Sequence, residues 1–336
     1  MTAFAPTIDE LRREVDRTIA ADLERRAAAL PEARLLIDEM WRLTAAGGKR
    51  LRPAFCYWGY RAAGGSHGRD IVRAASSLEL LHTFAIVHDD IMDASDERRG
   101  QESVHARHGV AVGILVGDLA LVLADDAFIG AGFAPAATAS AFAAYSRMRQ
   151  EVIAGQYLDL AYAARADITV AEARRVAVLK SGRYSIDEPL AIGAALAGAA
   201  EDLAARLAAF GAPLGEAFQL RDDLLGTFGD RSSVGKPVDS DIIEGKRNVL
   251  YAFATAALDG AEGTFLRERW GGDGLTAGEI ARLRGLVESS GARAATERLL
   301  DEQVDEALAR LRELEVGAGE RAALEELVFL ATARRA

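Results

Sequence analysis

The sequence predicts an all-α fold, and three observations support that prediction. Apolar residues recur three and four positions apart along most of the chain, as they do on the buried face of a helix. Alanine and leucine are abundant, aromatic residues make up only 7% of the chain, and runs of β-branched residues are scarce, which favours helices over strands. Only 7 prolines occur in 336 residues, so long helices can form without interruption.

The expected helices follow one another through short connections. The first begins near Thr7 or Asp9, either of which would cap it, and carries an apolar stripe of Leu11, Val15, Ile19 and Leu23. The same spacing predicts helices over 31–45, 51–64, 69–94, 110–130, 135–163, 170–180, 184–197, 200–228, 240–258, 276–290, 292–313 and 317–332. Glycine and proline cluster at 45–53, 62–70, 229–237 and 270–274, in breaks too short for interdomain linkers. We therefore expect a single domain over residues 1–336.

Charge and composition argue against several classes of protein. The formal net charge of -11 is the opposite of what a nucleic-acid-binding surface needs, so we expect no nucleic-acid partner. No window reaches the roughly 20 uninterrupted apolar residues of a membrane span. The first residues carry charges of both signs without the apolar stretch of a secretory signal. The single cysteine, Cys56, fits a reducing compartment, and we expect a cytoplasmic protein.

Paired aspartates occur in "HDDIMD" at residues 88–93, on the helix expected over 69–94. Asp89 and Asp93 stand one helical turn apart on the same face, and Asp90 lies beside them. Like charges at this spacing repel, so this row of aspartates destabilises the helix unless cations compensate its charge. Oxygen ligands without a nearby cysteine suit hard cations, and Mg²⁺ commonly binds one or two carboxylates plus substrate phosphates. The alternative is a solvated acidic helix end.

A second acidic segment, "QLRDDLLG" at residues 219–226, makes the metal hypothesis stronger. Asp222 and Asp223 form another carboxylate pair, and Gln219 one turn earlier can offer an amide oxygen. Two such helices facing one another would hold a small cluster of Mg²⁺ ions. We expect His88 to pack or support rather than bind metal, because histidine–aspartate metal sites need several spaced histidines and this chain has 5 in all.

Positive charges gather beside these acidic motifs, although the chain is acidic overall. Arginine binds phosphate oxygens bidentately and lysine acts as a point charge, so the mixture suits a diphosphate. Each residue taken singly reads as a solvated charge, but together they favour a metal-bridged anionic substrate. The clusters are Lys49, Arg50 and Arg52 in "GGKRLRP", Arg98 and Arg99 in "ERRG", Lys180 in "LKSGRY", Lys236 in "GKP" and Lys246 in "EGKRN".

In combination, these motifs resemble the trans-type isoprenyl diphosphate synthases, also called polyprenyl synthetases. The resemblance covers about residues 45–250, where the family's motifs follow in order: "GGKRLRP", "ELLHTFAIVHDDIMDASDERRG", "VGD", "GQYLDL", "KSG", and "FQLRDDLLG" followed by "GKP" and "EGK". It implies a helical bundle around a deep central cavity, usually in a homodimer. It also implies Mg²⁺-dependent, head-to-tail addition of isopentenyl diphosphate to an allylic diphosphate.

The resemblance further implies roles for individual residues. It makes Asp89, Asp93 and Asp222 the principal Mg²⁺ ligands, supported by Asp90, Asp223 and Gln219. It assigns Arg98, Lys180, Lys236 and Lys246 to the allylic diphosphate, with Lys180 and Lys246 counted as catalytic. It assigns Lys49, Arg52, His82 and Arg99 to isopentenyl diphosphate. Gln156 and Asp159 line the same cavity, or else cap and pack.

The second motif departs from the family's frequent Asp-Asp-x-x-Asp pattern. Its fifth position is Gly226, so the carboxylate expected one turn after Asp222 is missing. Because the first two positions are retained, we expect metal binding to survive with Asp222 as the essential ligand of that helix.

The residues before the first motif predict the product length. A carbocation must be kept from water, which accounts for the apolar "FAIV" preceding "DDIMD". Ala85 is small and lies one turn before Asp89, whereas the bulky Phe84 lies about 7.5 Å down the helix and should stop elongation early. By the resemblance, an aromatic residue here accompanies short products. The first motif also lacks a two-residue insertion common in bacterial farnesyl diphosphate synthases, so we expect geranylgeranyl diphosphate rather than farnesyl diphosphate.

Two other functions share parts of this pattern. A class I terpene cyclase would not need "GGKRLRP", His82 and Arg99 as another anion site, and its usual second motif of Asn, Ser/Thr and Glu is absent. A non-catalytic partner subunit typically loses an aspartate motif, whereas here the first is whole. The sequence leaves the allylic substrate open among dimethylallyl, geranyl and farnesyl diphosphate.

Overall fold

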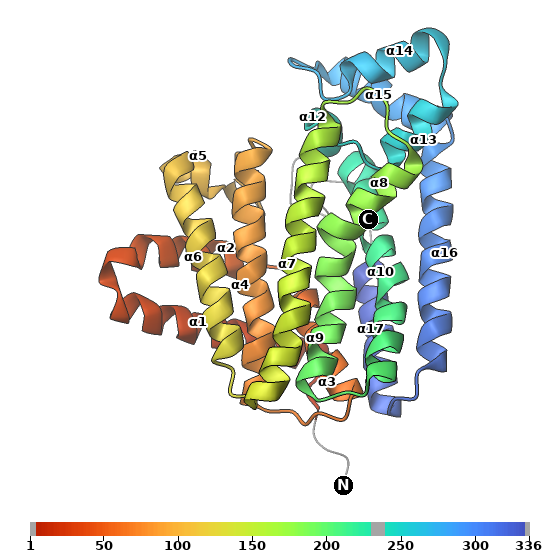
Figure 1. Ribbon diagram of the computed structural model, residues 1–336. Coiled ribbons are helices and arrows are strands. Elements are labelled where there is room, and N and C mark those ends of the chain that lie inside the picture. Colours follow the sequence, from red (N-terminus) through yellow and green to blue (C-terminus); the bar gives the residue numbers. More distant parts are fainter. Residues whose placement is uncertain (1–4, 230–238, 333–336) are drawn as a thin grey trace. The chain divides into compact units, whose positions relative to one another are not determined.

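Helices carry nearly all the regular structure of the computed structural model, which describes residues 5–229 and 239–332 (Figure 1). Within that described part, the only strands are β1 (Glu97–Arg98) and β2 (Gln101–Glu102), which pair as an antiparallel ladder. No helix among those residues is long and apolar enough to cross a membrane. The predicted all-α fold is confirmed.

The chain forms two compact units, whose boundaries fall inside or at the ends of helices. The first unit comprises α1 (Ile8–Ala29), η1 (Pro31–Ala33), α2 (Arg34–Ala45), α3 (Leu51–Ala62), α4 (Arg69–Met92), α5 (Val104–His108), α6 (Val110–Ile129) and most of α9 (Glu188–Leu196). The second comprises α8 (Val170–Ala177), η2 (Val178–Asp187), α12 (Ser240–Ile243), α13 (Val249–Ala257), α14 (Gly260–Arg269), α15 (Ala277–Ser289) and α16 (Ala292–Glu313). Residues of α7 (Pro135–Ala163), α10 (Glu201–Phe228) and α17 (Ala318–Thr332) belong to both.

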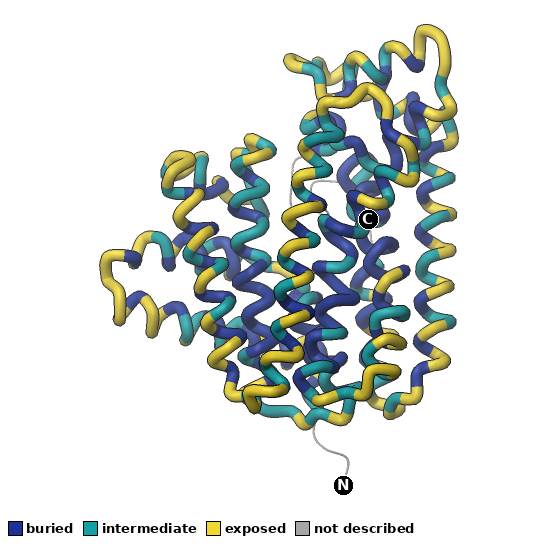
Figure 2. Tube along the Cα trace, viewed as in Figure 1, coloured by how far each residue is buried: buried dark blue, intermediate teal, exposed yellow. Residues whose placement is uncertain are grey.

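Helix α4 is the central element of the first unit. It packs against α1, α3 and α6, and α6 runs alongside it in Figure 1. More than half of its residues are buried, which explains why even small polar residues such as Ser76 and Ser77 lie inside. Burial decreases toward the end of the helix, where residues 88, 89 and 91 are partly exposed (Figure 2). This packing holds the first aspartate motif at the less buried end of a rigid helix.

The second unit has its own hydrophobic core, centred on α13. Tyr251 packs against Trp270 with ring centroids 5.3 Å apart, and Leu250 and Leu283 are fully buried beside them. The buried guanidinium of Arg247 donates to the carbonyl oxygens of three residues, Arg165, Gly245 and Trp270. These bonds fix the segment between α12 and α13, on which Lys246 lies.

The long helices were predicted to within two residues, but two local predictions were wrong and two short helices were missed. Residues 240–258 do not form one helix, because Gly245 adopts a φ of 70° and Asn248 caps a new helix by accepting from the Tyr251 amide. The break expected after residue 180 is absent, because the π-helix η2 joins α8 to α9. The short helices α5 and α14 were not predicted at all.

Candidate active site

The first aspartate motif occupies the last turn of α4 and is paired with an arginine. The Nε of Arg98 donates to the Oδ1 of Asp90 over 2.8 Å, and its Nη2 lies 3.4 Å from the Oδ2 of Asp89. Asp90 is only 1% exposed, whereas Asp89 and the C-cap residue Asp93 are partly exposed. Arg98 thus offsets the repulsion expected among these carboxylates and leaves Asp89 and Asp93 at the accessible side of the motif.

The donor set of this motif fits Mg²⁺ that is partly bound by a substrate. Asp89 and Asp93 offer oxygen only, and His88 is engaged elsewhere: its Nε2 lies 3.1 Å from the carbonyl oxygen of Ile114. Across residues 5–229 and 239–332, no group of three or more His, Cys, Asp or Glu side chains is arranged to hold a metal ion. Mg²⁺ is commonly bound by one or two carboxylates plus substrate phosphate oxygens, and the carboxylates of Asp89 and Asp93 are ligands of that kind.

His88 is a packing residue of the α4–α6 contact. A Cβ added to Gly117 of α6 would lie 2.2 Å from the Nε2 of His88, so the imidazole fills the place of a side chain on Gly117. The ring also stands edge-on to Phe84, with centroids 5.0 Å apart. This agrees with the packing role expected for His88, and it fixes the orientation of Phe84.

A second cluster, made of cationic side chains, surrounds His82, which lies about two turns before Asp89 on α4. The Nη2 of Arg99 lies 3.5 Å from the Nε2 of His82, and its Nη1 donates to the carbonyl oxygen of Leu43 over 3.0 Å. Burial, followed by the charges of Arg52 and Arg99, lowers the pKa of His82 well below its usual value, so the imidazole is neutral at pH 7. Positive charge around a neutral histidine is the electrostatic setting of an anion site.

The β1–β2 hairpin directs its two arginines to different targets. Arg99 and Gly100 occupy the turn with φ values of 54° and 73°, the arrangement of a two-residue type I′ hairpin loop. Arg98 lies before the turn and reaches the carboxylates of α4, whereas Arg99 lies within it and reaches His82. The hairpin is anchored to α2 by a 2.8 Å hydrogen bond from the Nη1 of Arg42 to the Oε1 of Gln101. The left-handed conformation of Arg99 is the one that this type of loop requires, and it places the Arg99 side chain at His82.

In the second unit, two of the predicted diphosphate lysines converge on one carboxylate. The Nζ of Lys180 lies 2.6 Å from the Oδ2 of Asp159, and the Nζ of Lys246 lies 3.4 Å from the same oxygen. Lys180 lies on the π-helix η2. The backbone of η2 packs closely against Gly155 of α7, because a Cβ added to Gly155 would lie 2.4 Å from the backbone nitrogen of Lys180. Sequence reasoning gave Asp159 only a general place in the cavity and missed that it joins both lysines. The predicted residue Lys236 lies outside the described residues.

The second aspartate motif contains a buried carboxyl group. Asp223 is 4% exposed and accepts a 2.7 Å hydrogen bond from the Nε2 of Gln219. Burial, followed by the charge of Asp241, raises the pKa of Asp223 well above its usual value. Asp222, its partly exposed neighbour, is therefore the better candidate for a charged metal ligand.

The missing carboxylate at Gly226 has a structural counterpart in Asp241. A Cβ on Gly226 would lie 2.5 Å from the Cγ of Asp241, whose Oδ2 accepts a 2.9 Å hydrogen bond from the Nδ2 of Asn248. The carboxylate of α12 thus occupies the place where a side chain at position 226 would begin. Sequence spacing could not reveal this contact, because Asp241 lies on a different helix, α12, which meets α10 only in the folded protein.

We expect Gly226→Asp, which restores the usual family pattern, to be harmful. The new side chain collides with Asp241, and such overpacking lowers the free energy of unfolding by about 1–3 kcal/mol. Urea denaturation would measure that loss, with Gly226→Ala as the control for bulk without charge. A variant that unfolds at the same urea concentration as the wild type and binds Mg²⁺ more tightly would contradict this interpretation of Gly226.

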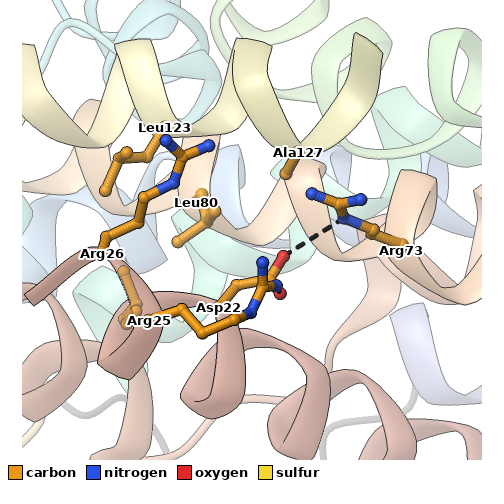
Figure 3. A pocket seen from close by; sticks show the side chains of 8 residues that line it. Asp22, Arg25, Arg26, Arg73, Leu80, Leu123 and Ala127 are labelled. Carbon is orange, nitrogen blue, oxygen red and sulfur yellow. Dashed lines mark hydrogen bonds and ion pairs between the residues drawn. The ribbon is translucent and has the colours of Figure 1, made fainter. Parts of the chain in front are cut away.

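A small pocket between α1, α4 and α6 is separate from these residues (Figure 3). Its arginines already have partners: Arg26 pairs with Asp126 over 2.8 Å, and Arg25 and Arg73 both contact Asp22. None of the residues predicted for catalysis lines it. We assign no function to this pocket.

Comparison with known proteins places the chain in a family. Residues 34–285, more than half of the chain, match the family model described as polyprenyl synthetase. A geranylgeranyl diphosphate synthase of Sulfolobus acidocaldarius is 37% identical over 222 residues, which cover 64% of this chain and 65% of that relative. A short chain isoprenyl diphosphate synthase of Methanothermobacter thermautotrophicus is 36% identical over 220 residues, 66% of each chain. The chain thus aligns with slightly less than two thirds of the length of these two relatives.

The structural likeness extends over nearly all of the chain. The crystal structure of a geranylgeranyl pyrophosphate synthase from Corynebacterium glutamicum, complexed with isoprenyl diphosphate and magnesium, matches with a TM-score of 0.94 and 33% sequence identity. The match covers 98% of this chain and 100% of the other. The family match, together with the two aspartate motifs and the basic clusters described above, shows that the chain belongs to the polyprenyl synthetase family.

Proposed function

We propose that this protein is a Mg²⁺-dependent prenyltransferase that adds isopentenyl diphosphate head to tail to an allylic diphosphate. The observation that carries this proposal is the cationic cluster around neutral His82, close along α4 to the first aspartate motif, in a protein whose net charge is -11. An enzyme acting on a single diphosphate has no need of that cluster beside a metal motif. Two anion sites of different chemistry suit two diphosphate substrates.

We assign the allylic diphosphate to the carboxylate motifs and their cations. Asp89, Asp93 and Asp222 are the principal Mg²⁺ ligands, with Asp90, Asp223 and Gln219 in support, and Arg98, Lys180, Lys236 and Lys246 contact the diphosphate. When bound, Mg²⁺ stabilises the negative charge that develops on the departing diphosphate. Arg98 holds Asp90 and Asp89 in place, and Asp159 keeps Lys180 and Lys246 together for the same anion.

We assign isopentenyl diphosphate to Lys49, Arg52, His82 and Arg99. The arginines bind phosphate oxygens, and the neutral imidazole of His82 donates one N–H to the same group. The allylic carbon–oxygen bond breaks, the double bond of isopentenyl diphosphate forms the new carbon–carbon bond, and a proton then passes to the released diphosphate. The apolar residues that precede Asp89 on α4 keep water from the carbocation.

We propose geranylgeranyl diphosphate as the main product and farnesyl diphosphate as the alternative. Phe84 supports a short product, because its bulky ring lies one turn and a residue before Asp89 and is held by the edge-on contact with His88. Ala85, one turn before Asp89, is too small to limit the product itself. A class I terpene cyclase or a non-catalytic partner subunit is the less favoured alternative, as both would leave the cluster around His82 without a use.

We further propose that the protein acts as a homodimer in the cytoplasm and that its two units work as one catalytic domain. The apolar outer residues of α6 support the dimer, because large side chains such as Leu115, Val122 and Ile129 are more than half exposed on a single helix. Light scattering should give twice the chain mass, and a monomer at micromolar concentration would exclude this part of the proposal.

The single cysteine supports the cytoplasmic location. The sharing of α7, α10 and α17 between the two units supports their action as one catalytic domain.

Initial rates of diphosphate release test the proposed reaction. We expect release to require isopentenyl diphosphate, an allylic diphosphate and Mg²⁺ together, and to stop when the metal is chelated. The control omits isopentenyl diphosphate. Release from the allylic substrate alone would favour a cyclase, and no release with any primer would favour the partner subunit.

A further inference from the structure

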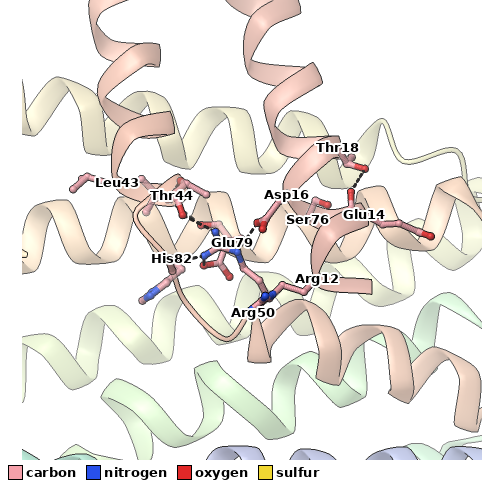
Figure 4. A network of polar contacts seen from close by, with 12 residues as sticks. Arg12, Glu14, Asp16, Thr18, Leu43, Thr44, Arg50, Ser76, Glu79 and His82 are labelled. Carbon is pink, nitrogen blue, oxygen red and sulfur yellow. Dashed lines mark hydrogen bonds and ion pairs between the residues drawn. The ribbon is translucent and has the colours of Figure 1, made fainter. Parts of the chain in front are cut away.

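Arg50 differs from the other cations of the "GGKRLRP" segment. In the sequence it stands beside Lys49 and Arg52 as another candidate phosphate ligand, yet it is only 4% exposed. Figure 4 shows its guanidinium turned inward, between Asp16 of α1 and Glu79 of α4. Its surroundings therefore point to a role inside the protein.

The guanidinium of Arg50 joins three segments of the first unit. Its Nε donates to the Oδ1 of Asp16 over 2.7 Å, and its Nη1 donates to the Oε1 of Glu79 over 3.0 Å. Its Nη1 and Nη2 also donate to two main-chain carbonyl oxygens, of Gly47 over 2.9 Å and of Thr44 over 2.5 Å. One side chain thus ties α1, α4 and the end of α2 to the turn that contains it.

The backbone of this turn is shaped around the Arg50 side chain. Arg50 has a φ of 53°, a left-handed conformation that is unfavourable for a residue with a Cβ. Gly48 has a φ of 131°, and a Cβ there would lie 2.7 Å from the Nη1 of Arg50. Such a conformation persists only where surrounding contacts hold it. The positions of Lys49, and of Arg52 in the first turn of α3, therefore depend on the Arg50 contacts.

Arg50 also balances a buried charge close to the cationic cluster. Glu79 is 3% exposed and lies three residues before His82 on α4. Glu79 acts electrostatically on Arg99, whose pKa is lowered chiefly by burial while the Glu79 charge acts in the opposite direction. Without Arg50, the unpaired Glu79 would attract Arg99, which now lies 3.5 Å from His82.

We propose that Arg50 is a positioning residue for isopentenyl diphosphate: by pairing with Glu79 and Asp16, it orders the turn carrying Lys49 and Arg52 and leaves Arg99 available to the substrate. Arg50 itself does not touch the diphosphate. This inference rests on the proposed function, because it presumes that the cluster around His82 binds isopentenyl diphosphate.

Kinetics of Arg50→Lys and of the double variant Arg50→Met/Glu79→Gln test this role. The double variant removes the buried charge together with its partner, so it keeps the fold if Arg50→Lys does not. In both we expect the KM for isopentenyl diphosphate to rise at least about tenfold, while the KM for the allylic diphosphate stays within about twofold. We also expect kcat at saturating isopentenyl diphosphate to change little, because the catalytic groups remain.

Arg61→Lys is the matched control. Arg61 is also a buried arginine of the first unit, and its Nη2 donates to the Oε1 of Glu320 over 2.9 Å. The Arg61→Lys variant should have a lower thermal stability than the wild type, while its KM values for isopentenyl diphosphate and for the allylic diphosphate stay unchanged. The positioning role is overturned if a folded Arg50 variant keeps the wild-type KM for isopentenyl diphosphate, or if both KM values rise together.

The wild type separates this inference from the proposed function. If the wild-type protein turns over no substrate, the proposed function fails, and calorimetric binding of isopentenyl diphosphate to the wild type and the double variant decides the inference. Weaker binding by the double variant supports the role of Arg50 even then. Equal binding, or no binding to the wild type, overturns it.

Discussion

Asp89→Asn should lower kcat by about a thousandfold or more, with the helical fold unchanged, because it removes a principal Mg²⁺ ligand of the first aspartate motif. Asparagine matches aspartate in size, and Asp89 lies at the partly exposed end of α4, so little packing is lost. Arg98 keeps its contact with Asp90, which holds the hairpin in place. Asp222→Asn should have a similar effect, because Gly226 leaves that helix without its usual third carboxylate.

Circular dichroism and Mg²⁺-dependent kinetics check this prediction together. The control is Asp38→Asn on α2, since Asp38 is an exposed carboxylate paired only on the surface, with Arg34. We expect the control to retain wild-type activity. Retained activity in Asp89→Asn, at any Mg²⁺ concentration that supports the wild type, would contradict the assignment of the metal ligands.

Phe84→Ala should shift the main product to chains longer than twenty carbons. Phe84 is held by its edge-on contact with His88, which in turn packs on Gly117, so removal of the ring opens space that neighbours on α4 do not readily fill. The converse variant, Ala85→Phe, should shorten the product, because it adds bulk nearer the metal motif. The two variants thus change product length in opposite directions on one helix.

Chromatography of the dephosphorylated products measures both shifts. The rate of isopentenyl diphosphate consumption serves as the control, because a change in length requires that the chemistry survives. An unchanged product distribution in Phe84→Ala would mean that another element limits elongation.

Much of the fold could be predicted from the sequence, because periodic apolar residues identify long helices. Helices α4, α6, α7 and α10 agree with prediction to within two residues. The prediction failed where a helix was expected to end at residue 180 and another to begin at 184, because the wider turns of η2 continue the helix across this segment. Helix α14 was missed because it is short and follows Asp259 without a strong apolar stripe.

The candidate site was predictable only where its residues share one helix or one turn. Asp89, Asp90 and Asp93 follow from helical spacing, and the placement of Arg98 near them was expected from the motif order. Spacing could not show that Arg50 turns inward to Glu79, because that contact joins residues 29 positions apart. The contact of Asp241 with Gly226 and the joint partner of Lys180 and Lys246 likewise depend on how the helices pack.

The most direct test of the central claim is the product formed from farnesyl diphosphate and isotope-labelled isopentenyl diphosphate in the presence of Mg²⁺. Mass spectrometry after dephosphorylation should show a twenty-carbon alcohol carrying one labelled five-carbon unit. An unlabelled fifteen-carbon hydrocarbon, or recovery of both substrates unchanged here and in the same assay with geranyl diphosphate, would contradict the claim that this protein joins two diphosphate substrates head to tail.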